Sequence, residues 1–260
     1  MVQTIAFFVL TPVGALYFCN FASICSIMKN IVLASTSTLY GGQYLDYLKA
    51  TLSDLFAGVE RIVFIPFARP GGISHDAYTA KAQEFFGDIG IKVTGLHTFD
   101  HKVQAIQAAK GFFTGGGNTF LLVKELHESG LMEVLKTAVE GGTPYLGASA
   151  GSNIGGINMR TTNDMPIVYP PSFDTMGLVN FNLNPHYLDP QPGLKHNGET
   201  RETRIGEFHT QNTVPVVGLR EGNWIRVKGD VVTTEGTEST RIFEAGKAPY
   251  ELPSGSRLNF

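Results

Sequence analysis

Short runs of β-branched residues alternate with segments of helical period from Met28 to about residue 150. Parallel strands must be joined by crossovers, so this alternation is typical of a mostly parallel sheet with helices on both faces. The predicted strands are residues 31–35, 61–67, 92–96, 111–114 and 143–148. We therefore expect an α/β fold in which a helix follows most strands.

The pattern changes after about Asn158, where loops rich in Pro and Asn precede shorter predicted strands. These lie at residues 214–219, 224–227, 231–234 and 241–244, and we expect them to extend or edge the same sheet. A length of 260 residues with 43% hydrophobic residues suits one large domain, which we place at residues 28–260.

Residues 1–27 are apolar and contain no Asp, Glu, Lys or Arg. A signal peptide or membrane anchor is one interpretation, but the segment lacks an early positive charge, and Pro12, Gly14 and Asn20 interrupt it. Met28 directly precedes the first predicted strand. We expect the extension to reflect a start assigned too early or an unpacked segment, with a true structural extension as the third alternative. For the main domain we expect a cytoplasmic location and no membrane contact.

Composition excludes several kinds of site from the main body. Both cysteines, Cys19 and Cys25, lie in the leading segment, so residues 28–260 have no thiol for a disulfide, a zinc site or a nucleophile. A net charge of -3 without blocks of like charge argues against nucleic acid as a partner.

Small residues crowd the stretch Gly147-Ala148-Ser149-Ala150-Gly151, between a predicted strand and a predicted helix. A nucleophile on such a turn stands at the carboxyl end of a parallel sheet, where open α/β folds bind ligands. The helix N-terminus also favours negative charge. Ser149 is thus a candidate nucleophile, although an ordinary tight turn gives the same five-residue pattern.

A second glycine-rich turn, Gly115-Gly116-Gly117-Asn118, follows the preceding predicted strand. Adjacent strands would bring the two turns together, so the N–H groups of Gly117 and Ala150 could converge on one oxygen as an oxyanion hole. A phosphate-binding loop is disfavoured because no Gly-Lys-Ser/Thr follows. A purely structural turn remains an alternative.

A serine nucleophile needs a base, and the chain has seven histidines. We favour His186, because the rigid Pro185 step would present its imidazole from a loop downstream of Ser149. A structural histidine is the competing interpretation. His97 and His101 have helical spacing but flank a strand end and a turn, so no metal is expected there, and the sequence indicates no cofactor.

The chain resembles the peptidase E family, aspartyl dipeptidases of the serine peptidase group whose flavodoxin-like fold is similar to that of class I glutamine amidotransferases. The resemblance runs from Met28 to about Phe260. Seven stretches carry it, at residues 65–68, 115–120, 149–151, 160–168, 184–186, 198–201 and 221–224.

The resemblance implies a Ser149, His186, Glu221 triad acting through an acyl-enzyme. His186 would accept the proton of Ser149 and return it to the leaving amine, while Glu221 would hold the ring and stabilise the imidazolium. Glu221 follows from the resemblance alone, because a glutamate in a loop is usually solvated.

The resemblance also implies a small peptide substrate, a dipeptide with an N-terminal aspartate. Arg201 would bind the aspartate carboxylate with two parallel hydrogen bonds, and Arg160 is a second candidate. Asp164 would face the substrate ammonium or order its own loop. Asn118 is also assigned to the substrate pocket.

Two other functions remain open. A cyanophycinase-like hydrolase of β-aspartyl-arginine peptides would share the serine turn, and a non-catalytic binding protein could use the same scaffold. Amidotransferase activity is excluded, because it needs a cysteine where this chain has Ser149.

Overall fold

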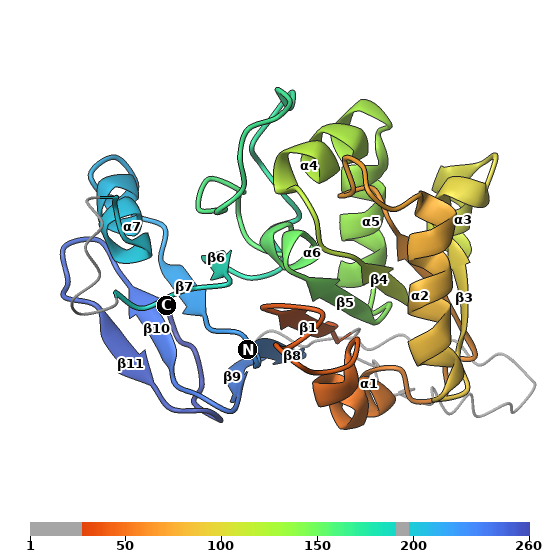
Figure 1. Ribbon diagram of the computed structural model, residues 1–260, viewed down its shortest axis with the longest axis horizontal. Coiled ribbons are helices and arrows are strands. Elements are labelled where there is room, and N and C mark those ends of the chain that lie inside the picture. The colour runs from red at the N-terminus through yellow and green to blue at the C-terminus, as the bar shows by residue number, and fades with distance from the viewer. Residues whose placement is uncertain (1–27, 191–197) are drawn as a thin grey trace, which may run out of the picture.

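Two sheets lie side by side in the computed structural model, which describes residues 28–190 and 198–260 (Figure 1). Within those residues the larger sheet has seven strands in the order β3-β2-β4-β5-β1-β8-β9. Their bounds are β1 Asn30–Ala34, β2 Arg61–Ile65, β3 Lys92–Gly95, β4 Phe112–Thr114, β5 Tyr145–Ala148, β8 Asn223–Lys228 and β9 Val231–Gly236. The prediction for residues 1–27 lies outside the described part of the chain.

The first five strands are parallel, as the sequence predicted. β5 pairs with β1 and β4, and β2 pairs with β4 and β3, all in the parallel sense. The predicted and observed bounds of these strands differ by at most two residues. β1 shows why these strands were recognisable in the sequence. Every side chain from Ile31 to Ala34 is buried, and a strand that is covered on both faces is apolar at every position.

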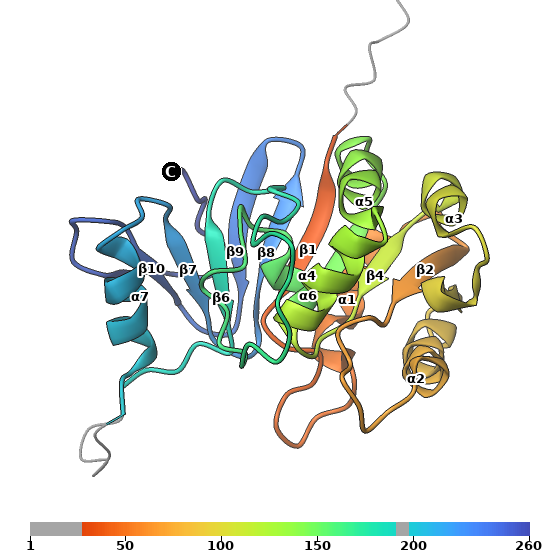
Figure 2. The ribbon, with the colours of Figure 1, turned by 90° about the horizontal axis from the view of Figure 1, so that it is seen from above.

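Helices cover both faces of this sheet (Figure 2). The helical segments in the described part are η1 Asp46–Leu48, α1 Lys49–Leu55, α2 His75–Gly87, η2 Leu96–Thr98, α3 Lys102–Ala108, α4 Thr119–Glu128, α5 Leu131–Glu140, α6 Ala150–Asn153 and α7 Arg201–His209. α1 and α2 pack on one face, and α3 to α6 pack on the other. Successive residues of β1 alternate accordingly, with Val32 in the first core and Ile31 in the second.

The second sheet has the strand order β11-β10-β7-β6. Its strands are β6 Asn182–Pro185, β7 Val216–Leu219, β10 Thr240–Phe243 and β11 Tyr250–Leu252. The expectation that all C-terminal strands join the main sheet is therefore half wrong. β8 and β9 do join it, antiparallel to β1, whereas β7 and β10 do not.

Packing explains this division. β8 pairs with β1 along the edge that a further strand of the main sheet would use. β7 instead buries Val217 against the main core and Val216 against α7. One apolar cluster includes residues of both sheets, from Ile31 of β1 to Ile242 of β10. We therefore propose that residues 28–260 fold as a single domain.

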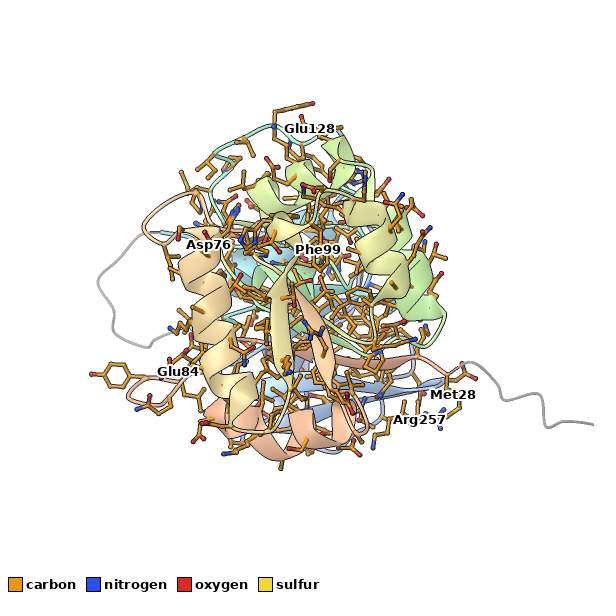
Figure 3. The ribbon with its side chains drawn as sticks, turned by 90° about the vertical axis from the view of Figure 1, so that its right-hand side faces the viewer. Met28, Asp76, Glu84, Phe99, Glu128 and Arg257 are labelled. Atoms are coloured by element: carbon orange, nitrogen blue, oxygen red, sulfur yellow. The ribbon has the colours of Figure 1, made fainter. Side chains whose placement is uncertain are left out.

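The outer end of the main sheet is covered by α2, on which Asp76 and Glu84 mark the two ends (Figure 3). Ser74 caps this helix by accepting a hydrogen bond from the N–H of Ala77 at 3.1 Å. In the described residues, no helix combines the length and the apolar character that crossing a membrane would demand.

Candidate active site

Ser149 connects β5 to α6 in a strained conformation, with φ 54° and ψ −110°. Its N–H donates to the Ala34 carbonyl of β1 at 3.1 Å, which ties the turn to the centre of the sheet. A Cβ on Gly151 would lie 2.1 Å from the Thr114 oxygen, so only glycine allows α6 to approach β4 this closely. The hydroxyl of Ser149 is thus held at the carboxyl ends of the parallel strands.

His186 follows β6 and also has a positive φ of 55°. Its N–H donates to the Ser35 hydroxyl at 2.9 Å, and that hydroxyl donates to the Leu219 carbonyl at 2.8 Å. Ser35 therefore joins the ends of β1, β6 and β7 and fixes the loop that carries the imidazole. The ring nitrogen Nε2 lies 3.1 Å from Ser149 Oγ.

Glu221, in the turn between β7 and β8, completes the group. Its Oε1 lies 2.6 Å from His186 Nδ1. A carboxylate only accepts hydrogen bonds, so Nδ1 carries the hydrogen and the lone pair of Nε2 faces Ser149. The structure brings together the three residues that the sequence and the resemblance nominated, from segments 37 and 35 residues apart.

The two glycine-rich turns meet because β4 pairs with β5, which places Thr114 opposite Gly147. Gly117 has a φ of 147°, and a Cβ there would lie 2.2 Å from the Ala68 oxygen. Across residues 28–190 and 198–260, no acceptor takes a hydrogen bond from the N–H of Gly117 or from that of Ala150, the first residue of α6. Both N–H groups are free to bind an oxyanion.

Asp164 and Asn118 connect the loop at residues 162–165 to the start of α4. Asp164 Oδ2 accepts from the Thr119 N–H at 2.7 Å and from the Thr162 hydroxyl at 3.0 Å. Asn118 accepts from the Leu121 N–H at 3.1 Å as the cap of α4 and donates to the Met165 carbonyl at 2.8 Å. Both side chains thus organise the wall beside the glycine-rich turn.

The two candidate arginines differ in their surroundings. Arg201 begins α7, and within the described residues no acceptor binds its guanidinium. Partial burial lowers its pKa, while the Asp164 carboxylate acts in the opposite direction, so the two charges are close enough to interact. Arg160 is exposed, donates to Asn212 Oδ1 at 3.3 Å and lies over the Phe173 ring.

Sequence reasoning missed Arg220, which lies between β7 and Glu221. Its side chain is 13% exposed and binds Asp189, three residues after His186, through two hydrogen bonds of 2.7 Å. It also binds Glu251 of β11 at 2.9 and 3.0 Å. Arg220 thus connects the loop that carries His186 to the turn that carries Glu221. Its only sequence signal is a position next to Glu221.

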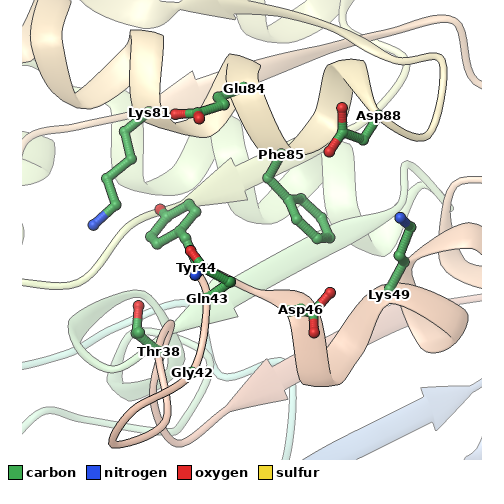
Figure 4. Close-up of a pocket in the computed structure, with 10 residues that line it drawn as sticks. All are labelled: Thr38, Gly42, Gln43, Tyr44, Asp46, Lys49, Lys81, Glu84, Phe85 and Asp88. Atoms are coloured by element: carbon green, nitrogen blue, oxygen red, sulfur yellow. The ribbon is translucent and has the colours of Figure 1, made fainter.

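A pocket of about 340 Å³ opens beside α2, and none of the site residues nominated above lines it (Figure 4). Its lining mixes lysines with carboxylates, and Lys81 lies 4.7 Å from the centre of the Tyr44 ring. In the described part of the chain, no three His, Cys, Asp or Glu side chains gather closely enough to hold a metal ion.

The family model described as Peptidase family S51 matches residues 31–234. The chain belongs to peptidase family S51. This assignment confirms the predicted family and class of enzyme: the chain is a serine peptidase.

Two relatives of the S51 chain carry more specific names. Peptidase E of Streptomyces coelicolor is 48% identical over 230 residues, covering 88% of this chain and 93% of the relative. A Drosophila melanogaster protein named "Probable alpha-aspartyl dipeptidase" is 42% identical over 235 residues, covering 89% and 97%. A solved structure of a peptidase from an acI-B1 actinobacterium is similar in fold, with a TM-score of 0.68 at 16% identity over 90% of this chain and 97% of that one.

Proposed function

We propose that this S51 peptidase hydrolyses dipeptides with an N-terminal aspartate, using Ser149, His186 and Glu221 and an acyl-enzyme intermediate. The observation that carries the proposal is the pair of contacts at His186, 3.1 Å to Ser149 Oγ and 2.6 Å to Glu221 Oε1. The names of the relatives, peptidase E and alpha-aspartyl dipeptidase, support the choice of substrate.

In the first half of the reaction, His186 Nε2 accepts the hydroxyl proton of Ser149 as Oγ attacks the carbonyl carbon of the aspartyl residue. The N–H groups of Gly117 and Ala150 stabilise the negative oxygen of the tetrahedral intermediate. Glu221 stabilises the imidazolium. As the peptide bond breaks, His186 returns the proton to the leaving amine, and the aspartyl group remains as an ester on Ser149.

In the second half, water replaces the departed amine. His186 accepts a proton from this water as its oxygen attacks the ester carbon, and the same two N–H groups bind the second oxyanion. Collapse of that intermediate transfers the proton to Ser149 Oγ, which releases aspartate and restores the enzyme.

Aspartate selectivity is assigned to Arg201. A guanidinium that no acceptor binds within residues 28–190 and 198–260 can offer its paired donors to a carboxylate of the substrate. Asp164, within electrostatic reach of Arg201, supplies the negative charge that suits the substrate ammonium. Arg160 is the weaker candidate, because its guanidinium already binds Asn212.

Hydrolysis of Asp-Leu, Ala-Leu and β-Asp-Arg by the wild type and by Ser149→Ala tests the reaction. We expect turnover of Asp-Leu that the substitution lowers by at least about a thousandfold, since the nucleophile is lost. Preference for β-Asp-Arg would instead indicate a cyanophycinase-like hydrolase. Binding without turnover, and no labelling of Ser149 by a serine-directed reagent, would indicate a binding protein.

Arg201→Ala tests the specificity. We expect the ratio of kcat/KM for Asp-Leu to that for Ala-Leu to fall by about 10- to 100-fold, because a charged hydrogen bond is worth about 1.5–3 kcal/mol. Arg204→Ala is the matched control: it lies on the same helix, is 54% exposed and pairs only loosely with Glu199 at 3.7 Å. An unchanged ratio in Arg201→Ala would refute the assignment, and a loss in Arg160→Ala instead would transfer the role to that residue.

A further inference from the structure

Tyr78 is a buried residue of α2 whose side chain packs against the glycine-rich turn at residues 115–117. Its side chain is 1% exposed, and its hydroxyl donates to the Gly116 carbonyl at 3.2 Å. A Cβ on Gly115 would lie 2.5 Å from the same hydroxyl. The tyrosine therefore reaches the turn closely enough to control the orientation of its peptide groups.

The carbonyl that Tyr78 binds belongs to the same peptide group as the N–H of Gly117. No described peptide bond is cis, so this carbonyl and this N–H point in opposite directions. Gly116 is also adjacent to the nucleophile, because a Cβ there would lie 3.0 Å from Ser149 Cβ. Holding the carbonyl toward α2 thus holds the N–H of Gly117 away from α2, free for the reacting oxygen.

This peptide group needs an external restraint because glycine flanks it on both sides. Glycine adopts positive and negative φ with similar ease, so the Gly116–Gly117 peptide can rotate more freely than one between other residues. A rotated peptide would direct the Gly116 carbonyl oxygen at the developing oxyanion, where two negative oxygens repel. The hydrogen bond from Tyr78 opposes that rotation.

The ring of Tyr78 is itself fixed from two sides. Phe64 of β2 contacts it edge to face, with ring centres 4.9 Å apart and planes at 88°. The Arg69 guanidinium lies 4.6 Å from the ring centre. A cation over the face draws electron density from the phenol and makes its O–H a better donor. Arg69 adjoins Ala68, whose oxygen also binds the Asn118 N–H at 2.7 Å, so one loop supports both the turn and the tyrosine.

We propose that Tyr78 is a positioning residue for the oxyanion hole, whose hydroxyl orients the Gly116–Gly117 peptide so that the N–H of Gly117 faces the tetrahedral intermediate. The inference rests on the proposed function, because it presumes that this N–H binds the oxyanion. Tyr78 is buried and would act through the peptide group that its hydroxyl binds.

Tyr78→Phe removes the hydroxyl and keeps the ring. We expect kcat for Asp-Leu to fall by about 10- to 100-fold, since losing an oxyanion donor outright costs about 10²- to 10³-fold and the variant retains the N–H in a less ordered orientation. KM should change less than about twofold, because the oriented N–H of Gly117 stabilises the tetrahedral intermediate and not the bound substrate. The pH profile of kcat/KM should keep its midpoint, since His186 and Glu221 are untouched.

Tyr250→Phe is the control. Tyr250 of β11 also donates its hydroxyl to an oxygen, Glu244 Oε1 at 2.9 Å, but in the second sheet and not in the glycine-rich turn. Its loss should leave kcat within about twofold. Rates are expressed per serine titrated with a covalent reagent, so that unfolded enzyme lowers the number of active sites and not the measured kcat.

A second readout is the affinity for the boronic acid analogue of aspartate, whose tetrahedral adduct places an oxygen in the hole. In Tyr78→Phe this affinity should fall by the same factor as kcat. Wild-type kcat per titrated serine in Tyr78→Phe, or an equal loss in Tyr250→Phe, would overturn the inference while leaving the proposed dipeptidase intact. A wild-type enzyme that hydrolyses no Asp-X dipeptide would refute the proposed function instead.

Discussion

Arg220→Met tests how far the second sheet holds the loop of His186 in place. Methionine replaces the apolar stem of the arginine with an unbranched side chain but lacks the guanidinium that binds Asp189 and Glu251. It also removes the donor to the Ser239 carbonyl at 2.6 Å. The loops that carry His186 and Glu221 would then be joined by fewer contacts, and we expect losses of both stability and turnover.

The size of the effect follows from exposure. Arg220 is 13% exposed, which favours strong bonds, but Asp189 is 53% and Glu251 36% exposed, so water screens each pair and can solvate either carboxylate once the arginine is gone. We assign about 1 kcal/mol to each carboxylate and a similar amount to the Ser239 bond. The free energy of unfolding should fall by about 2–4 kcal/mol at pH 7.

The same contacts predict how this difference depends on pH. Hydrogen bonds, first from Arg220 and then from Ser239 and Arg241, lower the pKa of Glu251 from 4.5 to about 2, and those from Arg220 also lower the pKa of Asp189. A carboxylate whose pKa is lower in the folded than in the unfolded protein stabilises the fold. This contribution is complete above the pKa of the unfolded state and is lost as pH falls through the pKa of the folded state. The stability gap between wild type and Arg220→Met should therefore be constant above about pH 5 and narrow between pH 4.5 and pH 2.

Urea unfolding at pH 7 measures the gap, and thermal unfolding from pH 7 to pH 2.5 follows its pH dependence. Arg61→Met is a suitable control, since Arg61 is exposed and makes one long hydrogen bond to Thr94 at 3.3 Å. A loss below about 0.5 kcal/mol for Arg220→Met, or a gap that does not narrow in acid, would refute the reasoning.

Two further predictions concern the triad. Glu221→Gln preserves the shape of the side chain but removes the charge that stabilises the imidazolium in the proposed mechanism. The kcat for Asp-Leu should fall by about 10²-fold or more with little change in KM, and a fall below fivefold would contradict the role. His186→Ala removes the proposed base, so kcat for Asp-Leu should fall by about 10²- to 10⁴-fold, the range that general acid–base catalysis contributes. A loss smaller than about tenfold would argue against a histidine base.

The sequence predicted the five parallel strands of the main sheet because burial on both faces leaves a strong local pattern. Residues 31–34 are apolar without interruption, and the small residues around Ser149 mark a turn with little room. The site was partly predictable for the same reason: two turns that follow adjacent parallel strands must meet.

Other features leave no local pattern. Ser35 holds His186 from 151 residues away, and a serine after a strand is too common to indicate such a contact. β6 was missed because Asn182-Leu183-Asn184-Pro185 contains no β-branched residue. The division of the C-terminal strands between two sheets was missed because a short strand shows the same alternation whichever edge it joins.

Ser149 and Gly117 belong to the large sheet, His186 projects from the small one, and Glu221 lies on the chain that passes between them. Under the proposed mechanism, turnover therefore depends on how closely the two sheets stay packed together. Partial denaturation that opens only the small sheet would abolish activity, because His186 would move away while the backbone at Ser149 stayed native. Activity would then be lost before most of the α/β core unfolds. Loss of function in a weakened variant would then measure local opening and not global unfolding.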